Sequence, residues 1–137
     1  MVELNVTLRG FEAPPSAVAS ALARAPDRLI RAGERINDVS SATYSRNALV
    51  YIFLLTPRDT FRDFLGRSVE SIGGWDAISA ARDSFSINYV EIDIIIEGES
   101  SAVGGSYFMP KEFILGLAKA EGSVAFSVAQ PDDGQSI

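Results

Sequence analysis

The segment 85–97, FSINYVEIDIIIE, constrains the fold more than any other part of the chain, because it is the longest apolar run and is rich in β-branched residues. From Val90 onward, apolar residues alternate with mostly acidic ones, which predicts a strand with one buried face. That face would carry Val90, Ile92, Ile94 and Ile96. The apolar residues at 85, 87 and 89 follow the opposite phase. We therefore expect either a β-bulge near residues 89 and 90 or a different neighbouring strand for residues 85–89.

The other face of the same strand is acidic. Glu91, Asp93 and Glu97 share it, and Glu99 follows shortly after. Carboxylates two residues apart on a strand lie about 6.5–7 Å apart, which suits the carboxylate pair of an inverting glycosidase. With Glu97 or Glu99, the pair could also hold a divalent cation. A solvated sheet face that only carries charge accounts for the same residues, so the pattern assigns no catalytic residue.

The chain contains no histidine and no cysteine. It therefore lacks the commonest general base, the usual catalytic triads, and the imidazole and thiolate ligands that bind zinc or copper. Oxygen atoms, which suit calcium or magnesium, are the metal donors that are left. We therefore expect a protein that is not an enzyme and that uses no cofactor and no resident metal ion.

Length and hydrophobicity describe one folded unit. The 137 residues, of which 47% are hydrophobic, suit a single domain with a real core. We place this domain at residues 1–130 and a polar tail at residues 131–137. The start of the chain alternates like a strand and does not resemble a secretory signal. No apolar run approaches the roughly 18 residues of a membrane helix, so we expect a cytoplasmic protein that binds no membrane.

Charge is distributed unevenly along the chain. Residues 1–82 contain ten basic and nine acidic side chains, whereas residues 83–137 contain two basic and nine acidic ones. The C-terminal part would repel the phosphates of nucleic acid. It would attract a basic protein partner.

Alternation, periodicity and capping signals place the remaining elements. Thr56 is the expected cap of the helix that follows the strand 48–55. That strand is apolar on both faces, so we expect it inside the sheet and covered on both sides at least in part. The sequence of residues 27–47 predicts no regular secondary structure beyond a short strand at 42–45. In the helix after Pro110, the expected core-facing residues are Phe113, Ile114, Leu117 and Ala118.

The order of elements indicates the fold class. Strands at residues 2–8, 48–55, 85–97 and 123–128 alternate with helices that begin near residues 16, 57, 75 and 110. This order predicts an α+β domain with a mainly antiparallel or mixed sheet and helices over one face. The specific prediction is a ferredoxin-like core with an added helix and strand.

Three segments carry a resemblance to a known family. They are NVTLRGFEAPPSAVASALARAPDRLIRAGE, with its Pro26 and Gly33-Glu34, then ALVYIFLL with the helix after it, and YFMPKEFILGLAKAEGSVAFSV. Together they resemble the bacterial family called domain of unknown function 4279. That family usually carries a tryptophan before the core of its middle strand, which this chain lacks. The resemblance implies an α+β fold and a small stand-alone cytoplasmic protein, and it implies no catalytic residue.

Two functions are consistent with these observations. The first is a non-catalytic interaction protein, such as an immunity-type inhibitor that binds a basic toxin through the acidic C-terminal half. Its contact residues would be Glu91, Asp93, Glu97 and Glu99. The alternative is a domain that binds a small molecule or cation, or a hydrolase, using the same carboxylates and the glycine-rich segment 98–106.

Overall fold

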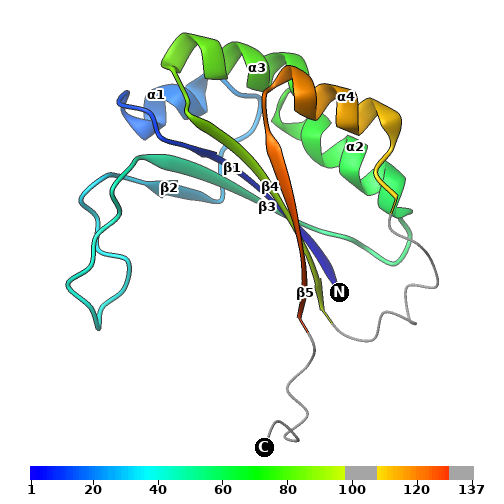
Figure 1. Ribbon diagram of the computed structural model, residues 1–137, viewed down its shortest axis with the longest axis horizontal. Helices are drawn as coiled ribbons and strands as arrows, with labels where there is room; N and C mark the ends of the chain where they lie inside the picture. The colour runs from blue at the N-terminus through cyan, green and yellow to red at the C-terminus, as the bar shows by residue number, and fades with distance from the viewer. Residues whose placement is uncertain (98–107, 130–137) are drawn as a thin grey trace, which may run out of the picture.

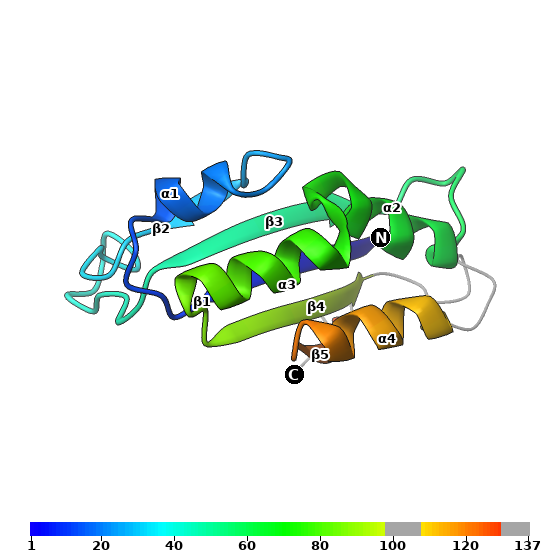
Figure 2. The same ribbon diagram turned by 90° about the horizontal axis from the view of Figure 1, so that it is seen from above.

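The protein is a two-layer structure in which helices cover one face of a five-stranded sheet (Figure 1). The computed structural model describes residues 1–97 and 108–129. The strands are β1 (Val2–Arg9), β2 (Arg28–Ile30), β3 (Ala48–Leu54), β4 (Tyr89–Glu97) and β5 (Ser123–Ala129). The helices are α1 (Pro15–Ser20), α2 (Phe61–Ile72), α3 (Gly74–Phe85) and α4 (Lys111–Lys119). Seen from above, all four helices lie on the same side of the sheet (Figure 2).

The strand order is β2-β3-β1-β4-β5. β1 pairs antiparallel with both β3 and β4, and β2 pairs antiparallel with β3. The elements from β1 to β4 therefore form the β-α-β-β-α-β arrangement of a ferredoxin-like core. The added elements are α4 and β5, and β5 pairs parallel with β4. The predicted fold class is confirmed.

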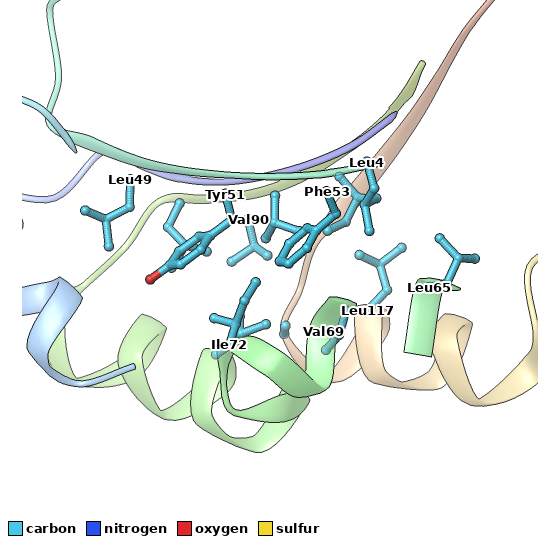
Figure 3. Packing of buried hydrophobic residues seen from close by; sticks show 14 of the residues in the cluster. Leu4, Leu49, Tyr51, Phe53, Leu65, Val69, Ile72, Val90 and Leu117 are labelled. Carbon is cyan, nitrogen blue, oxygen red and sulfur yellow. The ribbon is translucent and has the colours of Figure 1, made fainter. Parts of the chain in front are cut away.

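The core lies between the sheet and the helices. Leu49, Tyr51 and Phe53 of β3 point toward the helical layer, and Val69 and Ile72 of α2 point back toward the sheet (Figure 3). The Tyr51 hydroxyl donates a hydrogen bond to the carbonyl oxygen of Arg24 at 2.9 Å, and burial raises its pKa to about 12. The buried face predicted for β4 is confirmed, because its four aliphatic residues are at most 5% exposed: Val90, Ile92, Ile94 and Ile96.

Both alternatives expected for residues 85–89, a β-bulge or a different neighbouring strand, are wrong predictions. α3 continues to Phe85, and Ser86 ends it in the left-handed conformation with φ of 54°. Ile87 is buried in the connection that leads to β4. The alternation of apolar residues therefore changes phase because a helix ends here and a strand begins, and each element has its own buried apolar residues.

Three smaller expectations also need correction. Thr60, and not Thr56, caps α2, because its Oγ1 accepts a hydrogen bond from the Asp63 backbone N–H at 3.1 Å. The strand at residues 42–45 is reduced to an isolated bridge between Arg35 and Thr43. In α4, Phe113 and Leu117 are buried as predicted, whereas Ile114 is 51% exposed and Ala118 is exposed.

β3 was expected inside the sheet and covered on both faces at least in part. It does lie inside the sheet, between β2 and β1. On the face turned away from the helices, however, Ile52 is 39% exposed and Leu54 is 54% exposed. Of the helices that the structure describes, none is long and apolar enough to cross a bilayer.

Candidate interaction surface

We call the sheet face turned away from the helices the open face, because no described helix covers it (Figures 1 and 2). The strand registers bring its residues into rows. Asn5 of β1 lies between Ile52 of β3 and Asp93 of β4, and Thr7 lies between Val50 and Glu91. The open face thus has an aliphatic strip on β3, a polar strip on β1 and an acidic strip on β4.

Glu91 lies on the open face as predicted, but its charge is compensated. Both Arg9 Nε, at 2.8 Å, and Arg9 Nη2, at 2.5 Å, donate to the same Oε1 of Glu91. The Arg9 guanidinium also lies 4.6 Å from the ring centroid of Tyr89, and Arg46 approaches the same ring at 5.4 Å. Glu91 is therefore held in a fixed cluster and contributes little net negative potential.

Asp93 differs from Glu91 because it has no counter-ion within the described residues. Burial raises the pKa of Asp93, and the nearby Glu91 carboxylate raises it further. Across the strands, Asn5 Oδ1 is buried and finds no hydrogen-bond donor in the described part of the chain. The centre of the open face thus holds a carboxylate without a counter-ion beside an amide oxygen without a donor.

Replacing Asp93 by asparagine should change how stability depends on pH. The folded state holds the Asp93 proton more tightly than the unfolded state, because the pKa is raised from its ordinary value of 3.8. The stability that protonation provides is therefore present below pH 3.8 and is lost as pH rises through the folded pKa. We expect Asp93→Asn to match the wild type in acid and to become the more stable protein at neutral pH. Chemical denaturation across this range tests it, and a difference that does not change with pH would contradict it.

Glu97, at the end of β4, is exposed and also has no described ion pair. It points to the same face as Asp93, two residues beyond Ile95, whose register partner on β1 is Glu3. Glu97 and Glu3 therefore lie near one end of the open face, and Asp93 lies four residues, about 13 Å, from Glu97 along β4. Glu99, the fourth predicted contact residue, lies outside the described residues.

The acidity of the C-terminal half is neutralised at most other positions that the structure describes. Glu112 pairs with Arg62 at 3.7 Å, and Asp83 pairs with Arg82 at 2.9 Å. Arg82 also pairs with Glu121. Because Arg9, Arg62 and Arg82 all come from the N-terminal half, folding removes much of the charge asymmetry that the sequence shows. Within residues 83–97 and 108–129, Asp93 and Glu97 are the acidic residues without an ion pair, and Arg82, with one positive charge, neutralises only half of the charge of Asp83 and Glu121.

A groove between α2 and α4 lies on the opposite, helical side of the molecule. Its volume is about 650 Å³, and Val69, Trp75 and Phe113 provide apolar walls. The Trp75 and Phe113 rings meet edge to face with centroids 5.2 Å apart. No residue spacing in the sequence indicates this groove.

The described residues do not gather three or more acidic side chains into a group that could hold a metal ion. Comparison of the chain with known protein families, with curated proteins and with solved structures found no match. Any proposal for function therefore starts from the chemistry of the surface itself.

Proposed function

We propose that this protein is a non-catalytic interaction protein that binds a basic protein partner on its open face. The observation that carries the proposal is Asp93, a partly buried carboxylate that has no counter-ion within the described residues and whose pKa is raised by that burial. A lysine or arginine from a partner would supply the missing charge and the missing hydrogen-bond donor.

The surroundings of Asp93 favour a protein over a small ion. The side chain projects from β4, which is paired with a strand on each side, so little backbone order must be gained on binding. Beyond the polar strip of β1, Ile52 and Leu54 offer exposed apolar area of the kind that protein interfaces bury. A partner that presents a basic residue next to apolar ones would match both strips.

An immunity-type inhibitor, which neutralises a basic toxin, is the specific form of this function that we propose. The proposed membership of family 4279 fits such a small acidic protein. The alternative, a cation-binding or hydrolytic role for the β4 carboxylates, has less support because Arg9 already engages Glu91 through two nitrogen atoms.

The test begins with affinity capture from host extract at low and high salt, followed by binding kinetics with the purified partner. We expect the double variant Asp93→Lys/Glu97→Lys to associate roughly tenfold or more slowly than the wild type, because electrostatic steering is reversed. Added salt should slow association of the wild type and should change its dissociation little.

Glu112→Lys provides the matched control. It reverses a charge on α4, on the helical side, where Glu112 and its partner Arg62 are both well exposed. This variant should associate nearly as fast as the wild type, after allowance for the change in net charge. Equal slowing by the control, or no slowing by the double variant, would overturn the proposal. Circular dichroism should show that both variants are folded.

A further inference from the structure

The two edge strands of the sheet, β2 and β5, differ in how well they are protected from pairing with another chain. At the β2 edge, the strand is only three residues long, with Ile30 6% and Leu29 36% exposed. Beyond the end of β2, the Asp27 carboxylate accepts a hydrogen bond from the Ile52 backbone N–H at 2.7 Å. Arg28 and Arg31 add charge at or beside this strand. Such features protect an edge strand from pairing with another chain.

β5 lacks these features among the described residues. It forms the other edge of the sheet, seven residues long, and its sequence SVAFSVA contains no charge and no proline. An edge strand of this kind presents unpaired backbone groups along its outer side.

The side chains of β5 that face the helical layer are also uncovered. Val124, Phe126 and Val128 are the register partners of Ile92, Ile94 and Ile96 on β4. The β4 residues are at most 5% exposed, whereas Val124 is 36%, Phe126 is 46% and Val128 is 67% exposed. The helical layer therefore covers this edge only in part, and it covers Val128 least.

α4 adds apolar surface at the same edge, which it overlies in the view from above (Figure 2). Trp75 of α3 packs over Gly116, and Asp76 of α3 pairs with Lys119, so this side of α4 faces α3. Residues two apart on a helix are about 200° apart around its axis. Ile114, which is 51% exposed, therefore lies on the side of α4 that faces away from α3.

We propose that β5 pairs antiparallel with β5 of a second copy, which gives a symmetric dimer with one continuous sheet. The strand is self-complementary under a two-fold axis. With full overlap, Phe126 lies opposite Phe126 of the other copy, and Val124 lies opposite Val128. The α4 helices of both copies then lie on the same side of the joined sheet, where Ile114 completes an apolar layer over the paired strands.

Charge opposes a second copy least at this position. The chain carries a net charge of −6, so two copies repel one another over most surfaces. The uncharged strand β5 allows close approach, whereas the acidic strip of the open face does not. This inference is independent of the proposed function, because it uses a different surface and a different partner.

Cysteine cross-linking tests the pairing directly, because the chain has no cysteine of its own. Residues directly opposite each other in antiparallel strands have Cα atoms about 4.5–5.5 Å apart, which is within disulfide reach. Phe126→Cys should therefore form a cross-linked dimer under mild oxidation.

The same strand provides controls for this experiment. Val124→Cys alone and Val128→Cys alone should cross-link slowly. In the proposed register, the same residue of the two copies is offset by four positions, or about 13 Å along the strands. A mixture of these two variants should cross-link quickly. Cross-linking of Phe126→Cys that is no faster than that of Ile52→Cys, a residue of similar exposure on the open face, would overturn the proposal.

Mass measurement in solution tests the dimer without modification of the strand. Light scattering should give twice the chain mass for the wild type and the monomer mass for Val128→Lys, because a charged edge opposes pairing. Leu54→Lys, with the same substitution at a comparably exposed strand position, should remain dimeric. A wild-type protein that is monomeric at high micromolar concentration would refute the pairing. A strand from a different protein would then be the candidate partner of β5.

Discussion

Ile94→Asp should lower the free energy of unfolding by roughly 4 kcal/mol or more, because it places an unpaired charge in the core. Ile94 is fully buried at 0% exposure. It lies in the middle of β4, with Leu4 of β1 and Phe126 of β5 as register partners. Ile94 belongs to a core cluster of hydrophobic residues, so the aspartate would have to stay neutral or the local structure would have to open. Urea denaturation followed by circular dichroism measures the loss.

Ile95→Asp is the matched control, because it makes the same substitution one residue further along the strand. Ile95 lies on the open face and is only partly buried, so its variant should lose about 1 kcal/mol. A part of that loss would come from Glu3, the register partner of Ile95 on β1. Equal losses for the two variants would show that the two faces of β4 are assigned wrongly.

The faces of β4 could be predicted from sequence because acidic and aliphatic residues alternate along it. The end of α3 could not be predicted in the same way. Phe85 is the last residue of α3, and Ile87 lies in the connection to β4. Because both are apolar and two residues apart, they produce the same alternating pattern as a strand. The left-handed residue that separates the two elements is Ser86, which carries no glycine signal.

The uncovered face of β3 was also beyond prediction. Its residues on the open face, Val50, Ile52 and Leu54, are as apolar as those that face the core. Hydrophobicity therefore indicated cover on both sides. Which face the helices cover depends on the connections between the strands, and periodicity within one strand does not encode this.

For the candidate surface, the sequence identified the acidic strip but not its charge state. Glu91 and Asp93 appear equivalent in the alternating pattern. The structure distinguishes them because Arg9, which is 82 residues away in the chain, reaches Glu91 and leaves Asp93 without a counter-ion. Pairings at such sequence separation are set by the strand register, which a single sequence does not give.

Gly116→Ala should destabilise the protein by about 1–3 kcal/mol, although alanine favours helix over glycine by up to about 1 kcal/mol. A Cβ atom at Gly116 would overlap the ring of Trp75. That ring cannot move away freely, because its edge-to-face contact with Phe113 fixes it over α4. The clash should therefore exceed the gain in helix propensity, and thermal or urea denaturation would show a net loss.

Gly66→Ala tests this explanation, because it should raise the free energy of unfolding, whereas Gly116→Ala should lower it. Gly66 lies inside α2, and a Cβ atom there would meet no other atom within 4 Å. Only the helix propensity should change, so the variant should gain about 0.5–1 kcal/mol. Trp75→Leu in the Gly116→Ala background should recover part of the loss, because a smaller side chain leaves room for the methyl group. Stabilisation by Gly116→Ala on its own would mean that the Trp75 ring does not pack on α4 in solution.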